Sequence, residues 1–386
     1  MKNRRIFIIF LFLLFSCVFI SASSYAQECT IGYGYATTVL PKADQENFMW
    51  GFQYGLKKAY TENPATQGAC HSFENIKVVY KFSHDTQSPL DALLVANDLI
   101  KDNVIMMVGF PSSHEALLAA KVAQQHNMAF VSIGAVANGL AEYKDNIFTT
   151  SPKRETYTKE LIKGLANRHK GKEILIVAKK DFIFSMDILN TLQKENKPEY
   201  GLTLTPVFID ENLALDKQSL KNINLKNVAG VYITLYPSIS KLAFLELQDK
   251  LNGQTMFYVS SAWISNKIEF FDKIPLSTKK RVVGFGAGVP NLHSEALKPL
   301  HHAYEVVFNK KPEVAVFEGY EAGTYVAHVL KGSSAASRSA VLDSMMKMGC
   351  VSVETFGEMC RTPEGYSTKK LYFYYWSPEG YVPKSL

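Results

Sequence analysis

Short apolar runs and longer amphipathic segments alternate along most of the chain. Residues 75–82 and 104–108 are β-branched or aromatic runs typical of strands, and each precedes a segment with helical periodicity that ends near residue 100 or 125. This βαβα order predicts parallel strands, because each crossover helix returns the chain to the same edge of the sheet. Small ligands bind outside the carboxyl ends of such strands, where the turn 109–113 offers backbone amides, hydroxyl groups and a helix N-terminus.

The alternation occurs twice, which predicts two α/β lobes of similar build. The strands expected in the first series are 31–36, 75–82, 104–108, 129–133 and 147–150, and those in the second are 173–178, 203–209, 228–234 and 255–259.

Further helices are expected near both ends of the chain, and the C-terminal segment has a different pattern. A helix expected at 44–62 carries Gly51 and Gly55 four residues apart, so one face is expected to pack closely against a sheet. After a further strand at 281–285, three amphipathic helices precede a tail whose turn at 377–380 predicts an antiparallel finish.

The N-terminus has the pattern of a secretory signal peptide. Basic residues precede an apolar run from residue 6 to 15, and the small residues Ser24 and Ala26 predict cleavage before Gln27. In the alternative, the segment ending at Cys17 is a lipoprotein box, and a lipid anchors the protein. Because no later segment resembles a membrane span, we expect a periplasmic protein that is either released or lipid-anchored.

Charge and motif content argue against several classes of function. Removal of the signal peptide lowers the formal net charge from +6 by three, which leaves no electrostatic footprint for nucleic acid. Ser113 and His114 are adjacent on an expected helix, as are His301 and His302, and adjacent side chains diverge. Without a phosphate-binding glycine motif or a metal-binding Cys and His cluster, the sequence predicts neither an enzyme nor a cofactor or metal.

Four cysteines follow the cleavage site, and an even number in an exported protein indicates disulfides, with three possible pairings. Cys29 and Cys70 each precede an expected strand of the first sheet, so these strand starts are expected to lie side by side. Cys350 and Cys360 flank a short strand-like segment. We favour the pairs Cys29–Cys70 and Cys350–Cys360.

Several of these segments, in this order, resemble the type I periplasmic solute-binding proteins of the branched-chain amino-acid receptor kind. The similar segments are GFQYG at 51–55, the acidic turn HDTQSP at 84–89, the strand and serine turn at 104–113, the turn at 132–140, FEGYEA at 317–322 and the Gly-bounded turn at 357–365.

The resemblance implies two Rossmann-like lobes that close on a small molecule like a clamshell and are joined by three crossings. We expect these crossings near Ser151, Lys280 and Gly349. The first lobe would then comprise 27–150 and 281–349, and the second 151–280 and 350–386.

The resemblance also implies positions for the ligand. Ser112 and Ser113 match the turn that holds a ligand carboxylate, although either serine is equally expected to cap the helix that begins near Glu115. Ala135 and Val136 stand where amino-acid binders carry an Ala-Thr pair.

Phe184 replaces a family tyrosine. With Val136 and Phe184, two polar contacts have become apolar, which argues against a zwitterionic amino acid. The aromatic residues expected around the cleft, besides Tyr33, Tyr232 and Phe285, are Tyr35, Phe110, Phe182, Phe184, Tyr236 and Trp263. About half of such residues are expected to be ordinary packing residues. The remainder predict an apolar or aromatic ligand, with one carboxylate held at the serine turn.

These observations predict a monomeric receptor that delivers a small ligand to an inner-membrane ABC permease. The alternative is a ligand-sensing or regulatory subunit with the same clamshell, acting on a membrane or cell-wall partner. An enzyme on this scaffold is the weakest alternative.

Overall fold

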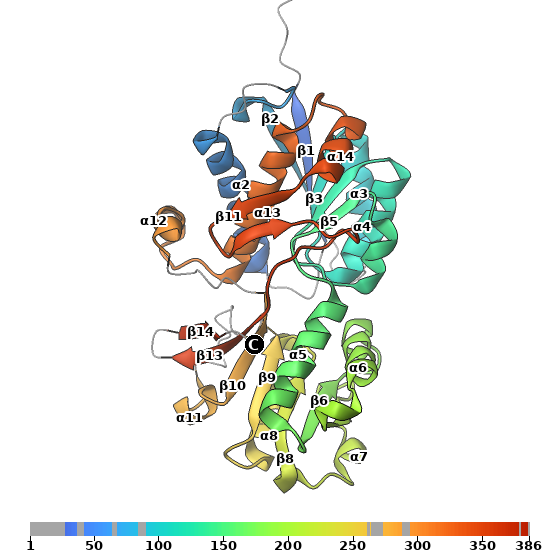
Figure 1. The fold of residues 1–386 in the computed structure, drawn as a ribbon, viewed down its shortest axis with the longest axis vertical. Coiled ribbons are helices and arrows are strands. Elements are labelled where there is room, and N and C mark those ends of the chain that lie inside the picture. The colour runs from blue at the N-terminus through green and yellow to red at the C-terminus, as the bar shows by residue number, and fades with distance from the viewer. Residues whose placement is uncertain are drawn as a thin grey trace, which may run out of the picture.

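The computed structural model describes residues 28–36, 42–63, 68–83, 90–260, 263, 273–287, 294–377 and 380–384. It forms two α/β lobes, the first above the second in Figure 1. The expected signal peptide, including Cys17, and the acidic turn at 84–89 lie outside the described residues. No helix in the described part of the chain is long and apolar enough to cross a membrane.

The first lobe is built on a parallel five-stranded sheet in the order β2-β1-β3-β4-β5. Its strands are β1 (Cys29–Tyr35), β2 (Ile76–Phe82), β3 (Met106–Gly109), β4 (Ala129–Ser132) and β5 (Ile147–Thr149). Both faces are buried: α3 (Asp91–Lys101) and α4 (Ser113–Gln125) cover one, and α2 (Lys42–Glu62), α13 (Val314–Lys331) and α14 (Arg338–Lys347) cover the other. Helix α12 (Lys298–Phe308) lies beside α13 and shares a small core with it.

Helices α2 and α13 approach each other more closely than side chains allow. A Cβ added to Gly51 would lie 2.0 Å from the carbonyl oxygen of Val316, and one added to Gly319 would lie 2.1 Å from that of Phe48. The glycine face of α2 therefore packs on a helix. The expectation that this face packs on a sheet is wrong. The glycines at 51, 55, 319 and 323 interlock the two backbones.

The second lobe has a seven-stranded sheet in the order β14-β13-β10-β9-β8-β6-β7. Its strands are β6 (Glu173–Ala178), β7 (Thr203–Phe208), β8 (Val228–Ile233), β9 (Met256–Ser260), β10 (Val282–Gly286), β13 (Tyr372–Ser377) and β14 (Gly380–Lys384). The first five are parallel, and β13 and β14 add the antiparallel finish that the sequence predicts.

Helices cover both faces of this second sheet. Helices α5 (Arg154–His169) and α6 (Ile183–Glu195) pack on one face and α8 (Pro237–Lys250) on the other. The remaining short helices are α7 (Lys217–Leu220), α11 (Leu276–Lys279), η1 (Phe73–Asn75), η2 (Asn138–Tyr143), η3 (Pro198–Tyr200), η4 (Leu225–Asn227) and η5 (Glu295–Leu297).

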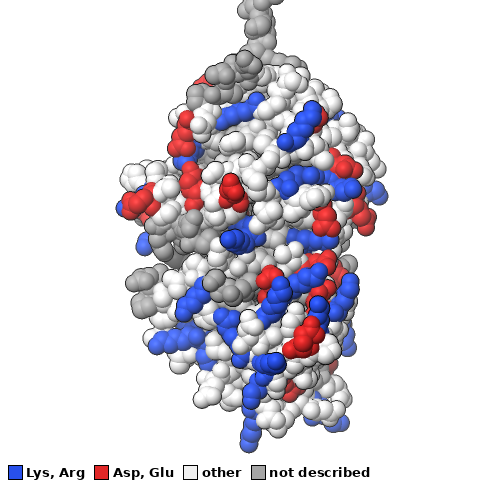
Figure 2. Space-filling view, viewed as in Figure 1, with Lys and Arg blue, Asp and Glu red and all other residues white. Residues whose placement is uncertain are grey.

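Acidic and basic side chains are interspersed over both lobes, with more basic ones on the second lobe in this view (Figure 2). On α5, Lys159 pairs with Glu155 at 2.6 Å and Lys163 with Glu160 at 2.7 Å. Exposed pairs of this kind contribute about 0–1 kcal/mol each. The stability of the fold therefore comes mainly from its buried cores.

Three crossings join the lobes, and two of them differ from the expected positions. The first, which includes Ser151, connects β5 to α5. Strand β10 pairs with β9, so the second crossing follows Gly286 and does not lie near Lys280. The expected assignment of 281–349 to the first lobe is therefore wrong for β10, which belongs to the second lobe. The sequence could not decide this, because a buried apolar run fits either sheet.

The third crossing lies at 367–371 and not near Gly349. The hairpin of β11 (Cys350–Val353) and β12 (Gly357–Cys360) buries Val351, Val353 and Met359 in the core of the first lobe. Leu371, in contrast, packs in the core of the second lobe. The amide of Ser367 donates to the carbonyl of Ser151 at 3.2 Å, so the first and third crossings run side by side.

Both expected disulfides are confirmed. Cys29, at the start of β1, bonds to Cys70, and Cys350 bonds to Cys360 directly across the β11–β12 hairpin.

Candidate ligand-binding site

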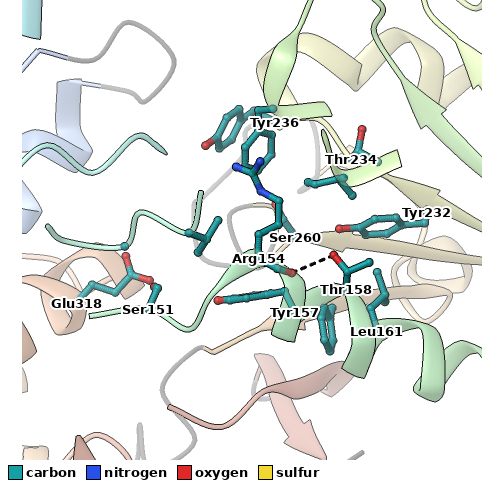
Figure 3. Close-up of a pocket in the computed structure, with 15 residues that line it drawn as sticks. Ser151, Arg154, Tyr157, Thr158, Leu161, Tyr232, Thr234, Tyr236, Ser260 and Glu318 are labelled. Atoms are coloured by element: carbon teal, nitrogen blue, oxygen red, sulfur yellow. Dashed lines mark hydrogen bonds between the residues drawn. The ribbon is translucent and has the colours of Figure 1, made fainter. Parts of the chain in front are cut away.

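A cavity of about 150 Å³ lies where the two lobes meet (Figure 3). The first lobe contributes Gly134, Val136 and Glu318, and the first crossing contributes Ser151. The residues from the second lobe are Arg154, Tyr157, Thr158, Leu161, Phe184, Ile188, Tyr232, Thr234, Tyr236, Ser260 and Phe285.

The parallel sheet of the second lobe explains why these residues converge. Ser260 ends β9, Phe285 is the penultimate residue of β10, and Tyr236 is the N-cap of the helix after β8. The carboxyl ends of parallel strands meet at one edge, so the segments that leave them share one site. The first turns of α5 and α6 close the same site with Arg154 and Phe184.

Arg154 is the cation of the cavity. It is the first residue of α5, and only 3% of it is exposed. Its Nη1 donates to Asp187 at 2.6 Å, whereas its buried Nε has no hydrogen-bond partner in the part of the chain that the structure describes. Burial lowers the pKa of the guanidinium, with Asp187 opposing, but an arginine in a protein stays protonated. A buried, charged donor with an unused nitrogen is suited to bind an anion.

Aromatic rings surround this cation. The guanidinium carbon of Arg154 lies 4.9 Å from the ring centroid of Phe184, and the Phe184 and Tyr236 rings stack with centroids 5.7 Å apart. Tyr157 meets Phe285 edge-on at 6.0 Å, and its hydroxyl accepts a hydrogen bond from the Ala287 amide at 3.2 Å. The wall is therefore apolar, with hydroxyl groups at its margins.

The tyrosine hydroxyls of the wall stay protonated near neutral pH. Burial raises the pKa of Tyr236 to about 12 and raises the pKa values of Tyr157 and Tyr232 as well. Each is thus available as a neutral hydrogen-bond donor.

Glu318 is the acid of the cavity. It lies on α13, half-buried, and burial raises its pKa to about 7; Glu321 and Asp44 raise it too, and Lys369 lowers it. A Cβ added to Gly134 would lie 3.7 Å from its Oε2, which places the carboxylate beside the turn after β4. Within the described residues it has no hydrogen-bond or ion-pair partner. Figure 3 shows it on the side of the cavity away from the guanidinium.

Five of the residues expected around the cleft line the cavity, namely Val136, Phe184, Tyr232, Tyr236 and Phe285. The serine turn does not line it. Ser112 caps α4 by accepting from the Glu115 amide at 3.4 Å, and the Ser113 hydroxyl accepts from the Val136 amide at 3.2 Å. The serines therefore hold the helix start and the neighbouring turn.

The other expected residues also lie outside the lining. Phe110 is fully buried against Phe130, with centroids 5.7 Å apart, and Trp263 is a core residue whose Nε1 donates to the Leu235 carbonyl at 2.9 Å. Aromatic residues after a strand can turn toward a core as readily as toward a cleft.

Ala135, Tyr35 and Phe182 do not line the cavity either. Ala135 and Tyr35 are buried in the two cores of the first lobe. Phe182 packs 6.0 Å from Phe184, centroid to centroid, and so supports the wall from behind.

Sequence reasoning missed both charged groups of the cavity. A signal was present for Arg154, because a cation at the first residue of a helix opposes the helix dipole and needs another reason to be there. Glu318 also carries a signal, since it interrupts the apolar segment VAVFEGY at the start of α13. Arg154 lies outside the segments used for the family resemblance, and Glu318 lies within one of them, FEGYEA at 317–322, but was not given a role in ligand binding.

Comparisons with known proteins agree with this architecture. A family model described as periplasmic binding protein matches residues 65–380. Among curated proteins, none matches the chain.

Several solved structures share the fold at low sequence identity. The substrate-binding protein LivJ of a branched-chain amino acid transporter from Streptococcus pneumoniae, in complex with isoleucine, superposes with a TM-score of 0.74 at 15% identity, covering 93% of this chain and 100% of that one. A solute-binding protein of an ABC transporter from Rhodopseudomonas palustris, in complex with 3,4-dihydroxybenzoic acid, has a TM-score of 0.73 at 16% identity, covering 93% and 97%. A second R. palustris solute-binding protein, in complex with benzoate, has a TM-score of 0.71 at 13% identity, covering 93% and 96%.

Proposed function

Because this chain belongs to the periplasmic binding protein family, we propose that it is an exported receptor that captures a small carboxylic acid with an apolar or aromatic body for an ABC permease. The family consists of substrate-binding receptors of ABC transporters and not of enzymes. The chemistry of the cavity supports the choice of ligand.

Arg154 carries this proposal. Among the described residues, its buried guanidinium has Asp187 as its one ionic partner and its Nε is unpaired, so a ligand carboxylate would complete its hydrogen bonding. Charge-assisted bonds from arginine to carboxylate are short, directional and about twice as strong as neutral ones. The proposed binding position of the ligand carboxylate is therefore the first turn of α5, and not the serine turn that the sequence analysis favoured.

The aromatic wall supports an apolar or aromatic body. A cavity of about 150 Å³ is large enough to hold a benzene-sized molecule, and aromatic and aliphatic side chains form a large part of its lining. Phe184 and Val136 offer no hydrogen bonds to an α-ammonium group. One solved structure with a similar fold is a complex with isoleucine, and another is a complex with benzoate. The fold alone therefore does not indicate which of these ligand classes binds.

A ligand in this cavity touches both lobes, which links capture to closure. Val136 and Glu318 belong to the first lobe and Arg154 to the second. A ligand shifts the balance between open and closed states only by its preference for one of them, and reversing a 1:99 ratio takes about a 10⁴-fold preference. Contacts from two lobes supply such a preference, because the open state makes only half of them.

The N-terminal segment and the two disulfides support a location outside the cytoplasm. The signal-like N-terminus, with cleavage before Gln27 or lipidation at Cys17, directs the chain out of the cytoplasm. The two disulfides suit an oxidising compartment such as the periplasm.

A thermal-shift screen of the purified mature protein tests the proposal. A ligand that binds only the folded state raises the melting temperature, by an amount that grows with concentration over Kd. Benzoate and related aromatic acids are expected to stabilise the protein more than leucine, isoleucine or polar amino acids. Stabilisation by amino acids without any by aromatic acids would contradict the proposal.

A further inference from the structure

The cavity holds a second charged group whose partner is missing from the described part of the chain. The carboxylate of Glu318 lines the cavity, is half-buried, and makes no hydrogen bond or ion pair with any described residue. A half-buried carboxylate loses part of its hydration, and no donor from the described residues replaces it. Its neighbour Glu321 shows the contrast, because Lys369 donates to it at 2.7 Å.

Glu318 and Arg154 stand at separate ends of the cavity. Charges that act on Glu318 come from Lys369, Glu321 and Asp44, and Arg154 is not among them. Tyr236 lies at the guanidinium end, and the charges of both Arg154 and Glu318 act on its hydroxyl. In Figure 3 the guanidinium points toward Tyr236, whereas Glu318 lies beside Ser151 on the opposite side.

Charges of both signs act on Glu318 from the described residues. Lys369 has the strongest effect but is paired with Glu321 at 2.7 Å, and Glu321 and Asp44 each disfavour a further anion beside Glu318. A ligand group at this end is therefore favoured if it donates a hydrogen bond and disfavoured if it is a second carboxylate.

We propose that Glu318 accepts a hydrogen bond from an O–H or N–H group at the end of the ligand opposite its carboxylate. The ligand class is then an aromatic acid with a distal donor, of the hydroxybenzoate or aminobenzoate type. This inference rests on the proposed function, in which Arg154 binds the carboxylate. An α-amino acid carries its ammonium and carboxylate on one carbon, so its two charges do not span the two ends.

Such a bond selects ligands as well as holding them. A methyl group in place of the hydroxyl fills the same volume but leaves the Glu318 carboxylate unpaired. Hydrogen bonds to charged groups contribute about 1.5–3 kcal/mol, which corresponds to a preference of about 10-fold to 150-fold.

Calorimetric titration of the purified mature protein tests this preference with two pairs of probes. 3-Hydroxybenzoate is compared with 3-methylbenzoate, and 4-hydroxybenzoate with 4-methylbenzoate. For at least one pair, the hydroxyl compound is expected to bind the wild type about 10-fold or more tightly than the methyl compound. In Glu318→Met that ratio is expected to fall to about one, whereas Glu305→Met, on the exposed face of α12, keeps it.

The outcomes separate this inference from the proposed function. If hydroxyl and methyl compounds bind the wild type equally, the role of Glu318 is overturned while the aromatic-acid receptor stands. An unchanged preference in Glu318→Met overturns it too. If no aromatic acid binds the wild type, both ideas fail. Should Glu318→Met not fold, Glu318→Gln replaces it, with a reduced preference expected and an unchanged one counting against the inference.

Discussion

The guanidinium of Arg154 stacks over the ring of Phe184, with its carbon 4.9 Å from the ring centroid. Arg154 is the first residue of α5 and Phe184 the second of α6, so the first turns of two neighbouring helices place a cation against an aromatic wall. A carboxylate bound to the cation would thus set its ligand body against Phe184 and Tyr236. In the proposed function, this arrangement would join the charge that attracts the ligand to the surface that selects it.

Phe184 is expected to contribute much of the apolar binding energy. In Phe184→Ala, affinity for benzoate is expected to fall by about 10-fold to 100-fold, because burying an aromatic side chain against a ligand is worth about 1.5–3 kcal/mol. Calorimetric titration measures the change. Phe208→Ala, on β7 of the same lobe and outside the cavity, provides the control and is expected to bind as the wild type does. Equal losses in both variants would show a general effect on the lobe.

The glycine contacts between α2 and α13 predict a large effect from a single methyl group. Gly319→Ala is expected to lower the free energy of unfolding by about 3 kcal/mol, because its Cβ would meet backbone that cannot move aside without separating the helices. Gly253→Ala is the control, since nothing lies within 4 Å of its added Cβ. Urea unfolding measures both. Similar stabilities for the two variants would contradict the tight packing.

The two disulfides are expected to contribute unequally. Cys29 and Cys70 are 41 residues apart and Cys350 and Cys360 are 10 apart, so the first bond removes more entropy from the unfolded chain. Loop-closure arithmetic gives about 4 kcal/mol and about 3 kcal/mol respectively. Pairwise replacement by alanine, followed by denaturant unfolding, is expected to destabilise the protein more for the first pair. The reverse order would show that strain in the folded state outweighs chain entropy.

Glu318 predicts a specific pH dependence of stability. Its pKa is raised to about 7 from an ordinary value of 4.5, so between these values the folded state binds more protons than the unfolded state. The stability that this group contributes is therefore present at low pH and declines as pH rises toward 7. The melting temperature of the wild type, relative to that of Glu318→Gln, is expected to fall as the pH rises from about 5 to about 7. A constant difference across this range would show that the carboxyl group titrates normally.

Much of the fold follows from local pattern, because strand and helix periodicity depends on neighbouring residues. Both disulfides, the parallel strands and the antiparallel tail are confirmed. The lobe that holds β10 was not predictable in this way, since the buried run VVGFG would fit either sheet. Its place is decided by pairing with β9 on one side and with β13, in the tail, on the other. Both partners are distant in sequence, so the local pattern does not reveal them.

The site was predictable only where it coincides with strand ends. Val136, Phe184 and Tyr236 follow strands and were expected at the cleft, and all three line the cavity. Trp263 follows a strand too, but its ring turns into the core. Arg154 and Glu318 reach the cavity through the first crossing and through the packing of α13, which depend on contacts that local pattern does not encode.

Titration of benzoate into the wild type and into Arg154→Met tests the central claim most directly. Asp187, the ionic partner of Arg154, has 55% of its side chain exposed, so the substitution leaves no buried charge and the variant is expected to fold. Loss of the carboxylate contact is expected to weaken benzoate binding by about 100-fold or more, with Arg154→Lys intermediate. Benzoate binding of equal strength in the wild type and Arg154→Met would contradict the account.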